Sequence, residues 1–262
     1  MSSFLVRLVF AISVVLPVSA PLAGSVDELS GFAFQPHPGA RLPLAAEFVD
    51  EQAHWVRLDQ FFSGRPVVLV LDYLRCRTLC GLTLGNLVAA LDALPLDAGR
   101  DFQVVVIDID PRDKPADVEA AKVKYLAGYH HPVAKDGWHF LTGQENMIRT
   151  VADAVGFPYR YEAALDQYIH PAGFVLAAGD GSISRYLLGV DIGSSDLRTA
   201  ITAAAQGKAQ GLVQRILLLC HGKDPNLGRH SLAIEAAFIV ANLMAMAGGV
   251  VVFVMIRRRS RG

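Results

Sequence analysis

The sequence predicts an α/β fold with a mixed sheet flanked by helices. Two continuous apolar runs, residues 66–71 (PVVLVL) and 101–109 (DFQVVVIDI), have the composition of strands that are buried on both faces. Two further apolar runs flank Asp180-Gly181, which is a strong signal for a β-hairpin and therefore for antiparallel pairing. Segments with helical spacing of apolar residues separate these strands, so helices are expected to cover the sheet.

The predicted elements alternate along the chain. Residues 25 to about 45 contain Pro and Gly and are expected to be irregular. Two short strand-like pieces joined by a polar turn, residues 47–49 and 54–58, predict an added N-terminal β-hairpin. The elements that follow are a strand at 66–71, a helix after residue 80, a strand at 101–109, a helix at 114–129, a strand at 138–141, a helix at about 144–155, the hairpin around 180–181 and a helix at 194–205. This order fits a thioredoxin-like layer.

The first 23 residues have the features of a secretory signal peptide. Arg7 precedes a short apolar run at residues 8–17, and small residues ending in Val18-Ser19-Ala20 follow it. The alternative is an uncleaved anchor helix. However, the run is short for a span of roughly 20 residues, and Pro17 and Pro21 interrupt it.

Residues 232–256 are almost wholly apolar and are predicted to form a transmembrane helix. At about 1.5 Å per residue, such a run can cross a bilayer core of about 30 Å. Residues 257–262 are basic, and positive residues next to a span stay in the cytoplasm. We therefore expect a single C-terminal span in the inner (cytoplasmic) membrane, a cytoplasmic basic tail, and the main domain on the periplasmic, extracytoplasmic side. An amphipathic juxtamembrane segment is expected at residues 211–231.

One domain, residues 24–210, is expected between the two ends. Its length suits a single hydrophobic core. The formal net charge of the whole chain is −1, so nothing indicates a nucleic-acid partner. Three cysteines in an exported chain do not make a disulfide framework, and they indicate one functional pair with one additional cysteine.

The functional pair is Cys76 and Cys80. The predicted elements place Cys76 in the loop at the carboxyl end of a central strand and Cys80 near the first turn of the next helix, where open α/β sheets bind ligands. A helix N-terminus lowers the pKa of a thiol, and Arg75 and Arg77 either add positive charge there or are simply solvated loop residues. The spacing leaves three interpretations open: a structural disulfide, a thiol–disulfide exchange centre, or part of a soft-metal site.

A third ligand would favour the metal site, and His170 is the best placed of the eight histidines. It stands directly before the predicted hairpin, in a loop able to return to the sheet edge that carries the cysteines. A lone histidine also has ordinary structural roles, so the residues alone leave its role open. The other histidines are expected at the surface or in packing contacts, with His130-His131 near a helix dipole.

Several motifs together resemble the Sco/SenC family of copper chaperones, which assemble the dinuclear copper site of cytochrome c oxidase. They are PVVLVLDYLRCRTLC, FQVVVIDIDPRD, GWHFLTG and the histidine in YIHPAGFVLAAGDGSISRYLLG, and they cover roughly residues 45–205. The stretch LLLCHGKDPNLGRHSLAI followed by a predicted span is similar to a bacterial branch of that family.

The resemblance implies a thioredoxin-like fold and a copper ion, Cu(I) or Cu(II), bound by Cys76, Cys80 and His170. Two thiolates suit Cu(I), and an imidazole lets the same site tolerate Cu(II). Three ligands leave a position open for an acceptor's ligand, so copper can move by ligand exchange. The implied acceptor is the copper-bearing subunit of cytochrome c oxidase, and other copper chaperones or thiol reductants are further implied partners.

The chain departs from the family pattern in two places. Arg77 follows the first cysteine where the family usually has Pro, and the predicted anchor is C-terminal where many members have an N-terminal one. The run 108–113 (DIDPRD) is implied to surround the copper site, and its alternative is a strand-end turn with paired charges. Cys220-His221 is either an extra ligand pair or, as a small apolar contact, part of the packing near the bilayer.

Copper delivery would make the chain a binding and transfer protein rather than an enzyme. The competing function is a thiol–disulfide oxidoreductase that keeps another protein's copper-binding cysteines reduced, which needs only Cys76 and Cys80 as a redox-active pair. His170 distinguishes these two functions. A redox or copper sensor is a third class, and a peroxidase is less expected because no further cysteine holds a convincing resolving position.

Overall fold

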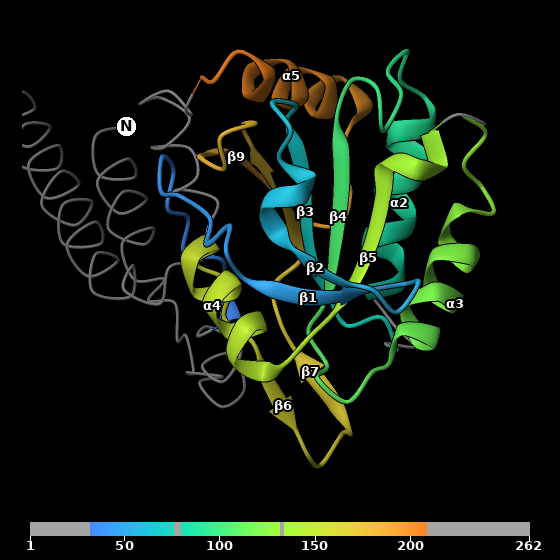
Figure 1. Cartoon of the computed structure of the whole chain (residues 1–262), viewed down its shortest axis with the longest axis vertical. Coiled ribbons are helices and arrows are strands. Elements are labelled where there is room, and N and C mark those ends of the chain that lie inside the picture. The colour runs from blue at the N-terminus through green and yellow to red at the C-terminus, as the bar shows by residue number, and fades with distance from the viewer. Residues whose placement is uncertain (1–31, 76–79, 132–133, 209–262) are drawn as a thin grey trace, which may run out of the picture.

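The computed structural model describes residues 32–75, 80–131 and 134–208. Within this part of the chain, seven strands form a sheet in the order β2-β1-β5-β4-β3-β8-β9, and β6 and β7 form a separate two-stranded ribbon (Figure 1). The central strands are parallel: β3 (Val67–Asp72), β4 (Gln103–Asp108) and β5 (Trp138–Thr142).

Antiparallel strands flank the parallel centre, so the sheet is mixed, as the sequence predicted. On one side, β1 (Glu47–Asp50) pairs with β2 (Trp55–Arg57) and with β5, which confirms the added N-terminal hairpin. On the other side, β8 (Gly173–Ala177) pairs with β3 and with β9 (Ile183–Leu188). The predicted turn at Asp180-Gly181 joins β8 to β9.

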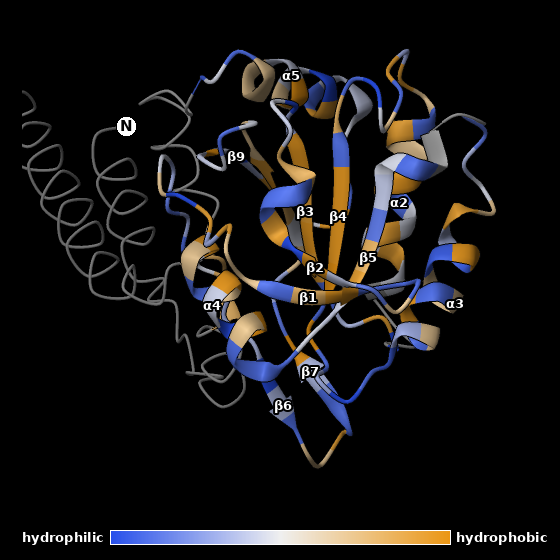
Figure 2. Ribbon diagram, in the orientation of Figure 1, coloured by the Kyte–Doolittle hydropathy of each residue, from blue (hydrophilic) through white to orange (hydrophobic). Residues whose placement is uncertain are grey.

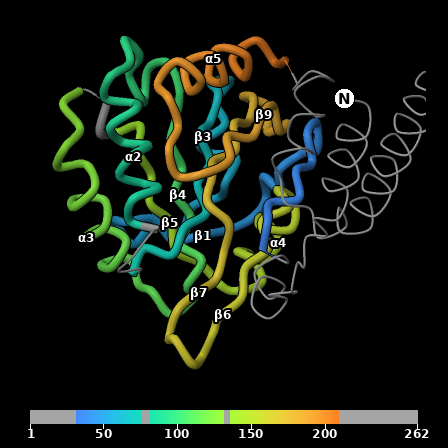
Figure 3. Tube along the Cα trace, turned by 180° about the vertical axis from the view of Figure 1, so that it is seen from behind, coloured from blue at the N-terminus to red at the C-terminus, as the bar shows by residue number. Residues whose placement is uncertain are grey.

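Four helices and two short 3-10 turns complete the described part of the chain. They are α2 (Cys80–Asp92), α3 (Pro115–Leu126), α4 (Glu145–Val155), α5 (Ser194–Ala205), η2 (Leu58–Phe61) and η3 (Ala134–Gly137). Residues of α2, α3 and α5 pack on one face of the sheet, and α4 packs on the other (Figures 1 and 3).

Each central strand contributes side chains to both faces, because side chains alternate along a strand. In β3, Val67, Leu69 and Leu71 join the core under α4, whereas Val68 and Val70 join the core under α2, α3 and α5. All six residues of β3 are buried, and Figure 2 shows the apolar character of β3 and β4. This double burial explains why the sequence shows continuous apolar runs at these two strands.

Some predicted elements differ from the structure. The second predicted helix, at 114–129, ends at Leu126 rather than at residue 129. Helix α5, in contrast, has the predicted bounds, Ser194–Ala205. The ribbon of β6 (Arg160–Glu162) and β7 (Gln167–Ile169) was not predicted, and it lies beyond the carboxyl ends of β3 and β4, at the bottom of Figure 1.

The predictions for the two ends of the chain lie outside the described residues. These are the signal peptide at 1–23, the juxtamembrane segment at 211–231 with Cys220-His221, the span at 232–256 and the basic tail at 257–262. Among the residues that the structure describes, no helix is long and apolar enough to cross a membrane.

Candidate metal centre

The structure describes the three predicted ligands to different extents. Cys76 lies outside the described residues. Cys80 is the first residue of α2, and its side chain is outside the described part of the structure. His170 is fully described and lies between the end of β7 at Ile169 and the start of β8 at Gly173.

His170 lies against the end of the strand that leads to the cysteines. Its Nε2 atom is 3.6 Å from Oδ1 of Asp72, the last residue of β3. Cys76 follows Asp72 by four positions, so their Cα atoms are at most about 14 Å apart even in a fully extended chain. The loop that carries the histidine therefore returns to the sheet edge that carries the cysteines, as the sequence predicted.

His170 is held as a buried neutral imidazole. Its side chain is 7% exposed, and burial lowers its pKa, although the carbonyl of Pro171 acts in the opposite direction. The Nδ1 atom is 3.0 Å from that carbonyl oxygen, which can only accept a hydrogen bond. The proton is therefore on Nδ1 and the lone pair on Nε2. The contact of Nε2 with Asp72 is an ion pair only when the ring is protonated, and burial disfavours that form.

This arrangement is typical of a metal-binding histidine. Such histidines usually donate the hydrogen of the second ring nitrogen to a carboxylate or a backbone carbonyl, which fixes the ring and the tautomer. The ring of Phe157 also stacks on His170, with 5.5 Å between ring centroids and 30° between planes. Orientation, tautomer and burial thus all favour Nε2 as the ligand atom.

Gly156 places Phe157 for this contact. It caps α4 in the left-handed region at φ 64°, where glycine is the residue of lowest conformational cost. A Cβ atom here would overlap the backbone oxygen of Gln35. The backbone N–H of Gln35 donates to the carbonyl of Gly156 at 2.7 Å, so the close approach forms a specific backbone contact.

Buried carboxylates continue the same sheet edge. Asp108 ends β4 in register with Asp72. Asp110 and Asp113 follow in the loop to α3, and their side chains are 0% and 1% exposed. Arg75, the residue before Cys76, places Nη2 at 2.8 Å from Asp110 and 2.5 Å from Asp113. The run 108–113 therefore lies beside Arg75, the residue before Cys76, and its charges are paired, as in the strand-end turn that the sequence also allowed.

Arg112 is a second cation on Asp110. It donates from Nε and from Nη2 at 2.8 Å each, while its backbone N–H donates at 3.0 Å. Burial alone would raise the pKa of Asp110, but the hydrogen bonds and charge of Arg112, with the charge of Arg75, lower it overall. Asp110 is therefore an ionised carboxylate held between two guanidinium groups.

The pKa values of Asp108 and Asp113 are raised, whereas that of Asp110 is lowered. Burial, followed by the neighbouring Asp113 carboxyl, raises the pKa of Asp108 well above its ordinary value. Burial also raises the pKa of Asp113, against the lowering effect of Asp108 and Arg75. Two carboxyl groups in contact within a buried site disfavour double ionisation, so this pair holds a proton more readily than surface carboxyls do.

Tyrosines of the unpredicted ribbon cover this edge. Tyr168 of β7 packs edge-on against Tyr73, with 5.3 Å between centroids, and lies 5.3 Å from its cross-strand neighbour Tyr161. The Arg112 guanidinium lies 4.7 Å from the Tyr161 ring centroid, in cation–π contact. The sequence signal for this ribbon was the alternation of Tyr159 with Tyr161, which is weak over three residues.

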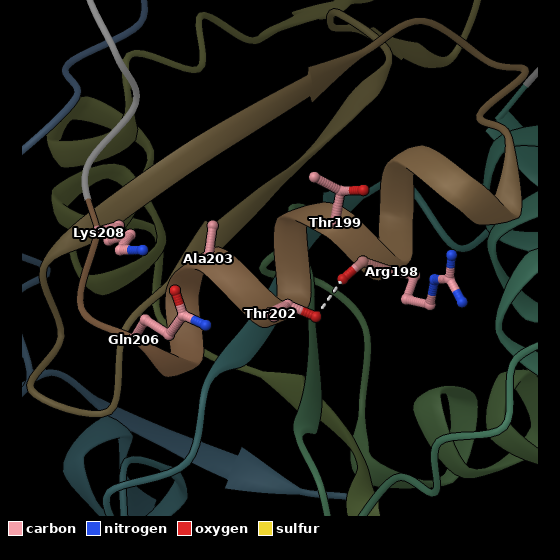
Figure 4. Close-up of a pocket in the computed structure, with 6 residues that line it drawn as sticks. All are labelled: Arg198, Thr199, Thr202, Ala203, Gln206 and Lys208. Carbon is pink, nitrogen blue, oxygen red and sulfur yellow. Dashed lines mark hydrogen bonds between the residues drawn. The ribbon is translucent and has the colours of Figure 1, made fainter.

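Other polar features of the described residues do not form a second metal site. No group of three or more His, Cys, Asp or Glu side chains in the described part of the chain is arranged to hold a metal ion. An open pocket on α5 is lined by Arg198, Thr199, Thr202, Ala203, Gln206 and Lys208 (Figure 4). The Thr202 hydroxyl there donates to the carbonyl of Arg198 within the same helix, and no cysteine, histidine or carboxylate lines the pocket.

Comparison with known proteins shows which family the sequence matches. A family model described as SCO1/SenC matches residues 43–205. A protein of Stutzerimonas stutzeri, named as a candidate copper-binding protein, is 27% identical over 159 residues, which cover 57% of this chain and 71% of that protein.

Solved structures share the fold. An Aquifex aeolicus protein, named as a candidate electron transfer protein, matches with a TM-score of 0.58 and 23% identity, over 66% of this chain and 96% of its own. Arabidopsis thaliana ScoI, solved with copper bound, matches with a TM-score of 0.50 and 19% identity, over 66% of this chain and 98% of its own. These similarities confirm the predicted thioredoxin-like fold.

Proposed function

This chain belongs to the SCO1/SenC family, and on that basis we propose that it is a copper chaperone. It binds one copper ion through Cys76, Cys80 and His170 and transfers the ion to a partner protein. Copper is its cargo, so the protein acts by binding and transfer rather than as an enzyme. The relative from Stutzerimonas stutzeri and the copper-bound Arabidopsis structure support copper as the metal.

One observation carries the proposal: a buried, neutral His170 presents Nε2 at 3.6 Å from Asp72, at the end of the strand that leads to Cys76. A histidine with only a packing role does not require a defined tautomer with Nε2 directed at this edge. Two thiolates and an imidazole are a soft and borderline donor set that suits copper in either oxidation state.

Transfer by ligand exchange follows from the number of ligands. A site with three protein ligands leaves room for a ligand of the acceptor, so copper need not be released to solvent. The residues around the site support this role: Phe157 stacks on the imidazole of His170, and Arg75 and Arg112 compensate the charge of Asp110.

The proposed acceptor is the copper-bearing subunit of cytochrome c oxidase, at its dinuclear copper site. A relative of known structure, BsSco, is described as a member of a family of cytochrome c oxidase assembly proteins, which supports this choice. We further propose that residues 232–256 tether the domain to the inner membrane on the extracytoplasmic side, where this subunit would be reached. Copper chaperones or thiol reductants that load and reduce the site complete the proposed set of partners.

A second function is favoured by the position of Cys80. It is the first residue of α2, where the helix N-terminus lowers the pKa of a thiol and promotes disulfide exchange. In this alternative, the chain is a thiol–disulfide oxidoreductase that reduces the copper-binding cysteines of an oxidase subunit. Cys76 and Cys80 then suffice, and His170 has no direct role.

Copper titration of the full chain, purified in detergent with its thiols reduced, distinguishes the two functions. We expect one copper per chain in the wild type and strongly weakened binding in His170→Ala. The matched control is His139→Ala: His139 also lies in the sheet and packs on an aromatic ring, 4.4 Å from Phe61, but it faces Gln103 rather than the cysteine loop. This control is expected to retain wild-type copper affinity.

Two outcomes would count against copper delivery. The first is unchanged copper affinity in His170→Ala. The second is a wild type that holds no stable copper while its Cys76 and Cys80 cycle readily through a disulfide, which would favour the oxidoreductase.

A further inference from the structure

Arg75 connects the cysteine loop to two buried carboxylates. It directly precedes Cys76 in the chain, and its guanidinium contacts Asp110 at 2.8 Å and Asp113 at 2.5 Å. Both carboxylates are almost fully buried, whereas the Arg75 side chain is 48% exposed. Arg75, the residue before Cys76, is thus held by ion pairs to the buried segment that follows β4.

Asp110 also connects to the histidine ribbon. Arg112, the second cation on Asp110, lies over the ring of Tyr161 in β6 and is 3.8 Å from Asp166 in the turn of the ribbon. The Tyr161 hydroxyl donates to Asp166 at 2.5 Å. The next strand of the ribbon, β7, runs directly into His170.

Asp110 therefore lies between the two segments that carry the predicted ligands. Arg75 links it to the segment of Cys76 and Cys80, and Arg112 links it to the segment of His170. The two segments are far apart in the sequence. Without the contacts through Asp110, only the sheet would set the distance between them. Groups that orient metal ligands from outside the coordination sphere commonly contribute 10- to 100-fold in affinity.

We propose that Arg75 and Arg112 are positioning residues for the copper site, and that they set the cysteine loop and the histidine ribbon relative to each other through their shared partner Asp110. The inference rests on the proposed copper function and adds to it the residues that preorganise the ligands. Neither arginine contacts copper in this proposal. The Nη2 atom of Arg75 contacts both carboxylates, so one side chain links the residue before Cys76 to Asp110 and to Asp113.

The test is a Cu(I) competition titration of the full chain in detergent, with a chromophoric chelator as the competitor. The variants are Arg75→Met, Arg112→Met and the double variant. The matched control is Arg100→Met, since Arg100 also bridges two aspartates, Asp97 at 2.6 Å and Asp101 at 2.9 Å, but precedes β4 at the opposite end of the strand.

We expect Arg75→Met and Arg112→Met each to weaken Cu(I) binding by about 10- to 100-fold, and Arg100→Met to change it by less than about twofold. The double variant should lose less than the product of the two single losses, because both arginines act through Asp110. The thiolate-to-Cu(II) absorption band should also shift in Arg75→Met and not in Arg100→Met, because the band responds to the geometry and surroundings of the thiolate ligands.

The outcomes separate the inference from the proposed function. A wild type without copper binding overturns the proposed function and the inference with it. A wild type that binds copper, beside an Arg75→Met variant with the same affinity and spectrum, overturns only the inference, and so do equal losses in Arg75→Met and Arg100→Met. If Arg75→Met does not fold, Arg112→Met decides: weakened Cu(I) binding supports the inference, and wild-type affinity refutes it.

Discussion

Replacing Asp110 with alanine should destabilise the whole domain, whether or not copper is bound. The carboxylate is 0% exposed and accepts hydrogen bonds from Arg75 Nη2, from Arg112 Nε and Nη2, each at 2.8 Å, and from the Arg112 backbone at 3.0 Å. Asp110→Ala removes these four interactions and leaves two cations without this shared acceptor.

The magnitude depends on how well the two guanidinium groups regain water. Breaking a buried ion pair by removing one partner costs about 3 to 5 kcal/mol. Both arginine side chains are 48% exposed, so they rehydrate in part and the lower end of this range applies. We expect a loss of about 3 kcal/mol in the free energy of unfolding. For a domain of this size, that corresponds to a fall of about 6 to 12 °C in Tm.

The assay is urea unfolding followed by tryptophan fluorescence, because Trp138 is fully buried in β5 and reports on the core. The matched control is Asp59→Ala: Asp59 pairs with Arg57 at 2.6 Å, but the two side chains are 39% and 53% exposed. That control should lose at most about 1 kcal/mol. A loss in Asp110→Ala no larger than in Asp59→Ala would refute the structural importance of the network.

Three further substitutions test other contacts. Gly156→Ala should lower the free energy of unfolding by at least about 3 kcal/mol, because the clash with the backbone of Gln35 adds to the cost of about 1 to 2 kcal/mol for a left-handed alanine. Thermal unfolding measures this loss. Lys122→Met removes the 2.5 Å partner of Glu51, which is 9% exposed, and should cost about 3 kcal/mol in the same assay. The wild type should lose stability as the pH falls from about 6.5 to about 4, and His139→Phe should lose less. Urea unfolding at each pH measures this loss.

The sign of the pH effect follows from protonation. Burial lowers the pKa of His139 to about 4 from 6.5. Between these values the unfolded chain binds a proton that the folded chain does not, so the free energy of unfolding falls as the pH falls. The full shift corresponds to about 3 kcal/mol as an upper limit. An unchanged pH slope in His139→Phe would contradict this assignment.

Control variants test the predictions for Gly156 and Lys122. Gly207 has φ 63°, nearly that of Gly156, but a Cβ there meets open space, so Gly207→Ala should cost only about 1 kcal/mol. Equal losses at the two glycines would show that the contact with Gln35 is unimportant. Glu51 also accepts the backbone N–H of Phe140, and Lys122→Arg should retain part of the stability that Lys122→Met loses. Equal stability of these two variants would argue against the ion pair.

Much of the fold could be predicted from the sequence, because each central strand has a strong local signal. The run PVVLVL is apolar at every position because β3 is buried on both faces, and Asp180-Gly181 is a strong local turn signal, with Gly181 at φ 81°. The β6–β7 ribbon had no such signal. Its strands have three residues each, Arg160 and Tyr161 are exposed, and contacts with Arg112 from a distant loop hold it in place.

Only part of the candidate site could be predicted from the sequence. Motif order indicated that the loop of His170 would return to the cysteine edge, and the contact with Asp72 agrees with this. Its ligand role, like the roles of Cys76 and Cys80, stays a prediction. The sequence could not indicate which carboxylates Arg75 would contact, because ion pairs between residues distant in the chain depend on the tertiary packing of β3, β4 and the following loop.

The pairing of β3 with β8 has a consequence for the order of folding. Val67 of β3 pairs with Ala177 of β8, so the two strands come from distant parts of the chain and meet late in synthesis. Until β8 is in place, one side of β3 is an unpaired apolar edge, which is prone to associate with other chains. His170 lies three residues before the start of β8 at Gly173 and contacts Asp72 at the end of β3. Docking of β8 on β3 would therefore cover this edge and also set the position of the histidine.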